Sequence, residues 1–129
     1  MPMSQTLFIE VLRSQLGQIN LDGVTRPEGT QLLSKCVRMM SSGMGFRCFP
    51  EYPAGLIQGR NSYIDFVCSE RGGFGATSNI AIEIDSSNKA LSLQKLLEMH
   101  DRGFHCVWVR WCVPICIIVP EKIHVIDLF

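Results

Sequence analysis

The chain has 129 residues, of which 47% are hydrophobic and 19% charged, and its 12 basic residues balance its 12 acidic residues. This length predicts a single domain, and this composition excludes a disordered chain. The zero net charge argues against a surface that is basic throughout, but it leaves room for a local basic cleft. The apolar content also suggests that a partner covers part of the surface.

Two amphipathic helices are predicted at the start of the chain. The first covers residues 4–16, with Ser4 as its N-cap and Gly17 as its stop. The second begins at Pro27, since proline is favoured in the first turn of a helix, and it ends at Gly43. Its apolar residues recur at helical spacing on one face, at Leu32, Leu33, Cys36, Val37 and Met40.

Beyond Gly45 the spacing of apolar residues changes from helical to alternating, which indicates strands. Three strands are predicted here, at residues 45–52, 62–68 and 79–85. Gly55 and Gly59 are expected in the loop between the first two strands, and a glycine-rich turn over residues 70–78 is expected before the third.

A helical pattern returns after Ala90 and ends near Gly103. Further strands are predicted at residues 104–111, 115–119 and, as an edge strand, 123–128. The order α-α-β-β-β-α-β-β, followed by the possible edge strand, predicts an α/β (α+β) domain with one mixed central sheet flanked by helices. Residues 1–25 would form an N-terminal helix and turn, and residues 27–128 the core.

The most apolar stretch and the six cysteines argue against two other classes of protein. Residues 107–120 are interrupted by Arg110, Pro114 and Pro120, well short of the ~18 apolar residues of a spanning helix. Only Cys112 and Cys116 have the close spacing of a metal-thiolate pair, and Pro114 lies between them. Because no export signal precedes the first helix, we expect a cytoplasmic protein with free thiols and no membrane partner.

Three acidic residues form the most informative pattern. Strand alternation places Glu83 and Asp85 on one face of residues 79–85, opposite the isoleucines that alternate with them. Asp65 lies in the preceding strand, so pairing of the two strands would bring three carboxylates together. Repulsion and desolvation disfavour such a cluster unless a hard divalent cation, Mg²⁺ or Mn²⁺, is bound. The alternative is that one or two of these acids point to solvent on an open sheet face.

At these residues the sequence resembles the PD-(D/E)XK nuclease superfamily, whose members carry one acid in a strand, an E-x-K or related pair in the next, and a helix behind. Asp65 in YIDF matches the first acid and Glu83 in AIEID the second, and the resemblance covers roughly residues 27–111. It implies a restriction-endonuclease-like fold and Mg²⁺-dependent hydrolysis of DNA, with Asp65 and Glu83 holding the metal and Asp85 contacting it directly or through a water molecule. A domain this small would cut both strands of DNA only as a homodimer or within a larger protein complex.

The chain departs from the superfamily at Asp85, where most members have lysine. The segment EIDSSNKALSLQKL resembles a subgroup in which E-I-D is followed by a polar loop and an S-x-x-K-L helix, which implies that the catalytic lysine lies downstream. Lys95 fits this pattern, but a helical wheel places it opposite the leucine-rich face formed by residues 93, 96 and 97, so the alternative is a solvated surface lysine. Lys89 is closer in sequence to the carboxylates, so both lysines stay candidates.

Glu28, in the first turn of the second helix, matches an additional acid that the superfamily often has there. A glutamate at this position also favours the helix dipole and needs no further role. Two functions are therefore expected as alternatives: a metal-dependent endonuclease, or a catalytically inactive nuclease fold that serves as a binding or inhibitory module. The missing lysine and the absence of a surplus of basic residues favour the inactive module. A third alternative is a structural subunit with no nucleic-acid role.

Overall fold

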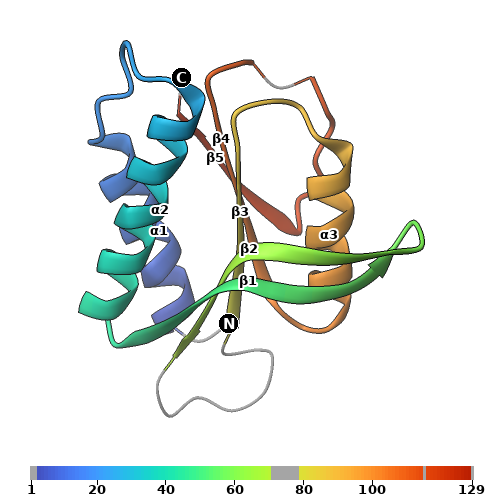
Figure 1. The fold of residues 1–129 in the computed structure, drawn as a ribbon. Helices are drawn as coiled ribbons and strands as arrows, with labels where there is room; N and C mark the ends of the chain where they lie inside the picture. Colours follow the sequence, from blue (N-terminus) through green and yellow to red (C-terminus); the bar gives the residue numbers. More distant parts are fainter. Residues whose placement is uncertain (1–2, 71–78, 115, 129) are drawn as a thin grey trace.

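Helices α1 (Met3–Gly17) and α2 (Arg26–Gly43) lie on one face of a sheet, and α3 (Ala90–Asp101) lies on the other (Figure 1). The computed structural model describes residues 3–70, 79–114 and 116–128. Its five strands, in chain order, are β1 (Phe46–Ile57), β2 (Arg60–Glu70), β3 (Asn79–Asp85), β4 (His105–Trp111) and β5 (Ile123–Leu128). The predicted α/β class and the predicted order of elements are confirmed.

The strands follow one another across the sheet in chain order, but their directions change at β3. β1 with β2 and β2 with β3 are antiparallel, whereas β3 with β4 and β4 with β5 are parallel. A parallel pair requires a crossover connection, which α3 provides between β3 and β4. The predicted antiparallel pairing of the second and third strands is confirmed, and the glycine-rich turn at residues 71–78 lies outside the described residues.

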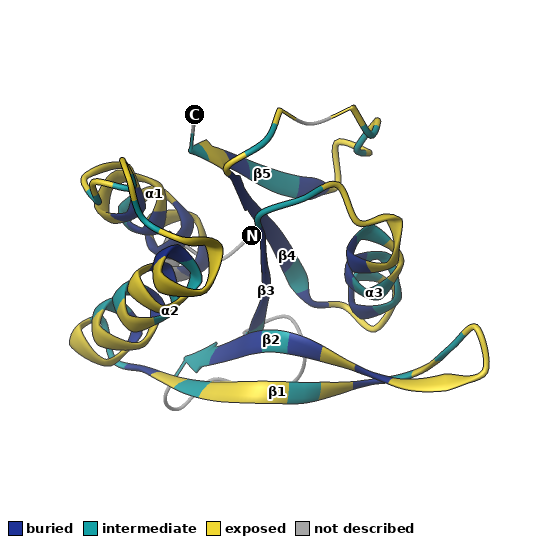
Figure 2. Cartoon of the chain, turned by 45° about the horizontal axis from the view of Figure 1, so that its top comes forward, coloured by how far each residue is buried: buried dark blue, intermediate teal, exposed yellow. Residues whose placement is uncertain are grey.

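The sheet separates two apolar clusters (Figure 2). Under α1 and α2, the core contains Ile80, Ile82 and Ile84 of β3. Under α3, it contains Ala81 of β3 together with Leu96 of α3 and Trp108 of β4, among others. Because side chains alternate along a strand, Glu83 and Asp85 share the α3 side with Ala81, as the alternation predicts.

The start of α2 packs closely on the end of β4. A Cβ atom added to Gly29 would overlap the indole ring of Trp111. We expect Gly29→Ala to lower the free energy of unfolding by about 1–3 kcal/mol, because neither the helix backbone nor a buried indole has room to move away. Chemical denaturation measures this change. Gly17→Ala is the matched control, because its Cβ would meet no atom within 4 Å, and equal stability of the two variants would contradict this packing.

The prediction of a strand at residues 115–119 is wrong. Residues 112–114 and 116–122 contain no strand, and Ile118 is 92% exposed. The prolines at positions 114 and 120 bracket the segment and donate no backbone hydrogen bonds. The Asn88 side chain instead bonds the Pro114 carbonyl (3.1 Å) and the Cys116 N–H (3.3 Å), so a side chain replaces the strand partner.

The first strand is longer than predicted, and Gly55 lies within it instead of in a loop. β1 continues past Pro50 and Pro53 to Ile57, with a bulge between Pro53 and Gly55. Prolines and bulges are tolerated because β1 is the edge of the sheet, where one side of the strand needs no ladder partner. Only Gln58 and Gly59 remain to form the turn into β2.

Within the part of the chain that the structure describes, no helix has both the length and the apolar character needed to cross a membrane.

Candidate functional site

The ladder between β2 and β3 ends in the middle of the sheet. Paired residues run from Ser69 opposite Asn79 to Phe66 opposite Ile82, and Asp65 is the first residue of β2 beyond them. From there the β1–β2 hairpin crosses over α3 while β3 continues beside β4 (Figure 1). We call the diverging segments, residues 63–65 of β2 and 83–85 of β3, the strand fork. Where the two strands diverge, backbone N–H and C=O groups lose their hydrogen-bond partners on the neighbouring strand. Buried groups of this kind need other partners.

Asp65 and Glu83 exchange hydrogen bonds across the strand fork. The Asp65 N–H donates to Glu83 Oε1 at 2.9 Å, and the Ile84 N–H donates to Asp65 Oδ2 at 2.8 Å. Each carboxylate therefore satisfies a backbone donor on the opposite strand. Glu83 is only 2% exposed, Asp65 is half-buried and Asp85 is 6% exposed, so Glu83 and Asp85 do not lie on an open, solvated sheet face.

Lys95 reaches the strand fork from α3. Its Nζ lies 3.2 Å from Glu83 Oε2 and donates to the Tyr63 carbonyl at 2.9 Å. Its side chain is only 15% exposed. Lys95 therefore contacts both strands of the fork, through the Glu83 carboxylate of β3 and the Tyr63 carbonyl of β2.

The prediction of a solvated surface lysine at position 95 is wrong. The buried residues of α3 are Ser92, Leu96 and Met99, whereas Leu93 and Leu97 are only half-buried. At about 100° per residue, Lys95 lies within roughly 60° of both Ser92 and Met99 around the helix axis. This side of α3 faces the hairpin and the strand fork, which a wheel built on leucines alone does not reveal.

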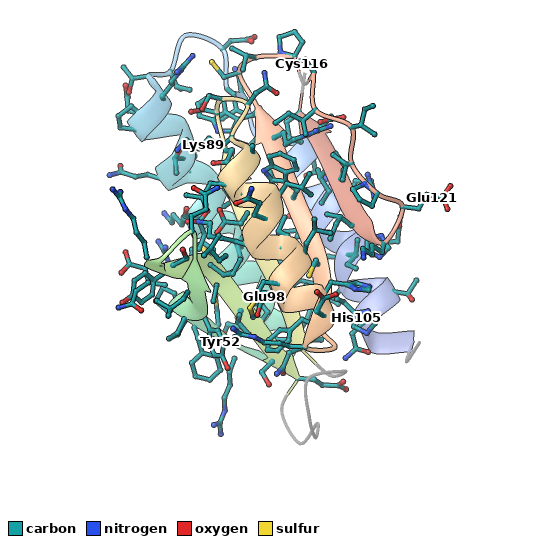
Figure 3. The ribbon with its side chains drawn as sticks, turned by 90° about the vertical axis from the view of Figure 1, so that its right-hand side faces the viewer. Tyr52, Lys89, Glu98, His105, Cys116 and Glu121 are labelled. Carbon is teal, nitrogen blue, oxygen red and sulfur yellow. The ribbon has the colours of Figure 1, made fainter. Side chains whose placement is uncertain are left out.

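Asp85 is bound by a buried tryptophan. Trp108 Nε1–H donates to Asp85 Oδ2 at 2.7 Å, and Lys89 Nζ lies 3.9 Å from Asp85 Oδ1. Lys89 is 61% exposed and lies at the N-terminal end of α3, whereas Glu98 lies toward its other end (Figure 3). Of the two candidate lysines, Lys95 thus contacts Glu83 and Lys89 contacts Asp85.

Trp108 and Arg110 also belong to this region, although the sequence did not predict contacts with the acids for either. Trp108 is buried and stands opposite Glu83 in the parallel ladder. The Arg110 guanidinium lies 5.0 Å from the centre of the Trp108 ring and bonds Asp127 at 3.0 and 3.3 Å. A tryptophan in an apolar run was a usable signal, because a buried indole N–H normally has a partner.

Burial raises the pKa of two acids at the strand fork. Desolvation raises the pKa of Asp65, the hydrogen bond from the Ile84 N–H opposes this, and the negative charge of Asp85 adds to it. Desolvation and then the charge of Asp65 raise the pKa of Glu83 to about 7, while Lys95 and the Asp65 N–H oppose the rise. Glu83 therefore holds a proton over part of the neutral range of pH. Its ion pair with Lys95, taken alone, would instead suggest an ionised carboxylate.

Glu28 takes part in a helix cap. Its Oε1 accepts from the Thr25 N–H at 3.2 Å, and its own N–H donates to Thr25 Oγ1 at 3.2 Å. This reciprocal pair is a capping box at the start of α2. The side chain is exposed, and the hydrogen bonds with Thr25 lower its pKa. Its role as an additional acid of the site stays a prediction.

The oxygen donors at the strand fork fit a hard divalent cation. Asp65 and Glu83 provide carboxylate oxygens on adjacent strands, and a bound cation would offset the burial and repulsion that raise their pKa values. Across residues 3–70, 79–114 and 116–128, no group of three or more His, Cys, Asp or Glu side chains is placed to hold a metal ion. A cation here would therefore use one or two carboxylates and several waters, as Mg²⁺ commonly does.

Comparison with known proteins gives no further information about this site. Comparisons with protein-family models, with curated protein sequences and with solved structures gave no match. The resemblance to the PD-(D/E)XK superfamily stays a prediction that depends on the acids of β2 and β3 and on the order of elements.

Proposed function

We propose that the protein is a Mg²⁺-dependent endonuclease that hydrolyses DNA phosphodiester bonds at the strand fork. The observation that carries this proposal is the meeting of Asp65, Glu83 and Lys95, which come from three different elements. Buried ionisable groups cost free energy, and a buried ion pair is weak evidence of a stabilising role. Acids with raised pKa values next to a specific cation are characteristic of catalytic sites.

Each residue at the fork has a role in this proposal. Asp65 and Glu83 would hold the metal, and the Trp108 N–H would keep Asp85 beside them. Bound Mg²⁺ or Mn²⁺ would supply polarisation of the phosphate and a more acidic water. The Lys95 ammonium group would stabilise negative charge that develops on the phosphate, because it is the cation that contacts Glu83.

We also propose partners and a cellular compartment for the protein. One domain of this size covers part of a duplex, so cleavage of both strands would require a homodimer or a larger protein complex. The cysteines at positions 36, 48, 68, 106, 112 and 116 are all free, which supports a cytoplasmic protein.

One observation favours the alternative, a catalytically inactive binding or inhibitory module. Both oxygens of Glu83 are already engaged, Oε1 by the Asp65 N–H and Oε2 by Lys95. The network at the fork is thus satisfied by protein groups and would hold the diverging strands in place without a metal.

Calorimetric titration with Mn²⁺ and Mg²⁺ distinguishes the two functions. We expect the wild-type chain to bind Mn²⁺ at millimolar concentration or below, and Asp65→Asn to abolish binding, because the substitution removes a charged ligand while its amide oxygen can still accept from the Ile84 N–H. Asp101→Asn, at an exposed carboxylate at the end of α3, is the matched control and should bind as the wild type does. A wild-type chain that binds neither metal would favour the inactive module.

A further inference from the structure

Two cysteines face each other on the side of the sheet opposite the strand fork. Cys48 and Cys68 are direct partners in the antiparallel β1–β2 ladder, and both pack in the core under α1 and α2. Directly opposed residues of antiparallel strands have Cα atoms about 4.5–5.5 Å apart, within the roughly 4.4–6.8 Å range of disulfides. The two thiols are close enough for each to shift the pKa of the other. The spacing of the two paired strands therefore lies within the range in which a disulfide can form.

The two thiols differ in exposure and acidity. Cys48 is half-buried, whereas Cys68 is fully buried, with Ser41 Oγ 3.2 Å from its sulfur. The hydrogen bond from Cys68 and the positive charge of Arg38 lower the pKa of Cys48, despite its partial burial. The hydrogen bond with Cys48 and burial raise the pKa of Cys68. A half-buried thiol of lowered pKa beside a fully buried thiol is an arrangement in which cysteine oxidation can end as a disulfide.

We infer that Cys48 and Cys68 form a redox-active dithiol that a hydroperoxide oxidises to a disulfide. The Cys48 thiolate attacks the peroxide, so that an S–O bond forms, the O–O bond breaks and two electrons pass from sulfur to oxygen. The departing oxygen takes a proton and leaves as water or alcohol, and Cys48 becomes a sulfenic acid. Cys68 then attacks that sulfur, the S–O bond breaks, and the Cys68 proton leaves with the hydroxide as water. A small-molecule dithiol reverses the reaction by thiol–disulfide exchange.

This inference does not depend on the proposed nuclease function. Cys68 belongs to the apolar cluster under α1 and α2, whereas Glu83 and Asp85 lie on the α3 side of the sheet. None of the acids or lysines of the strand fork takes part in the oxidation.

Hydrogen peroxide treatment of the reduced 129-residue chain tests the inference. Free thiols are then alkylated, and peptide mass spectrometry locates any disulfide. We expect an intramolecular Cys48–Cys68 disulfide that dithiothreitol removes. Cys68→Ser should leave Cys48 as a sulfenic acid that dimedone traps, and Cys48→Ser should leave Cys68 unmodified. Cys36→Ser is the matched control, because Cys36 is also partly buried against this core, and it should form the disulfide as the wild type does.

Three results would overturn the inference, and all are read on the wild-type chain, whatever the variants do to folding. They are a disulfide between Cys112 and Cys116 in place of the expected one, a disulfide between two copies only, and irreversible oxidation of Cys48 with no disulfide.

Discussion

Lys95→Ala is expected to lower the rate of DNA cleavage roughly 10²–10³-fold, as is typical when a preorganised group that stabilises transition-state charge is removed. Lys95 Nζ lies 3.2 Å from Glu83 Oε2 and is largely shielded from solvent, so its charge acts in a region of low polarity. Single-turnover cleavage of a labelled duplex at saturating Mg²⁺ measures the effect. The same substitution leaves Glu83 without its counter-charge, so thermal unfolding must be measured in parallel and rates referred to the folded fraction.

Lys89→Ala is the informative comparison. Lys89 is 61% exposed and lies 3.9 Å from Asp85, so solvent screens its charge and we expect a much smaller loss of rate. Lys122→Ala, at an exposed lysine next to β5, is the control and should cleave as the wild type does. If Lys89→Ala abolished cleavage and Lys95→Ala did not, the catalytic cation would be Lys89.

The stability of the metal-free protein is expected to fall as pH rises through neutrality, and Glu83→Gln is expected to remove much of this fall. The folded protein holds a proton on Glu83 with a pKa of about 7, whereas the unfolded chain releases it near the ordinary value of 4.5. The unfolded state therefore binds fewer protons between these values, and stability is lost as pH rises toward and through 7. The difference between these two pKa values corresponds to a loss on the order of 3 kcal/mol.

Denaturation in the presence of a chelator at several pH values between about 5 and 8 measures this dependence. The relevant quantity is the difference in unfolding free energy between wild type and Glu83→Gln, since other groups titrate in both. We also expect added Mg²⁺ to stabilise the wild type more at pH 8 than at pH 6, because the cation and the proton compete for the same carboxylates. Parallel pH curves for wild type and variant would show that Glu83 is ionised throughout this range.

Most elements could be predicted because their sequences carry one clear period. In α2, Leu33 and Val37 repeat at helical spacing behind Pro27, and in β3 every second residue from Ile80 is isoleucine. The errors fall where proline punctuates the chain. Proline interrupts a central strand but is tolerated in an edge strand, so its effect depends on where the strand lies in the sheet. Without that information, the prediction ended β1 too early and wrongly placed a strand between Pro114 and Pro120. Edge position is a tertiary property that the local sequence does not contain.

The candidate site could be predicted in part for the same reason. Asp65 and Glu83 are acids within apolar strands, a pattern that is visible locally. The contact of Lys95 with Glu83 depends on which side of α3 the hairpin covers. The bond from Trp108 to Asp85 depends on the parallel register of β3 and β4. Both depend on how distant segments meet, which periodicity does not encode.

The exposed edge strand β1 limits how copies of this protein associate. At 12 residues it is long for an edge, and long, flat edges template the strand-to-strand aggregation that leads to fibrils. Pro50 and Pro53 cannot donate backbone hydrogen bonds, and the bulge before Gly55 bends the strand. A strand from another copy of the protein would therefore find an interrupted row of backbone N–H donors along a twisted edge. Any dimer that cuts both strands of DNA would therefore have to form through a surface other than the β1 edge.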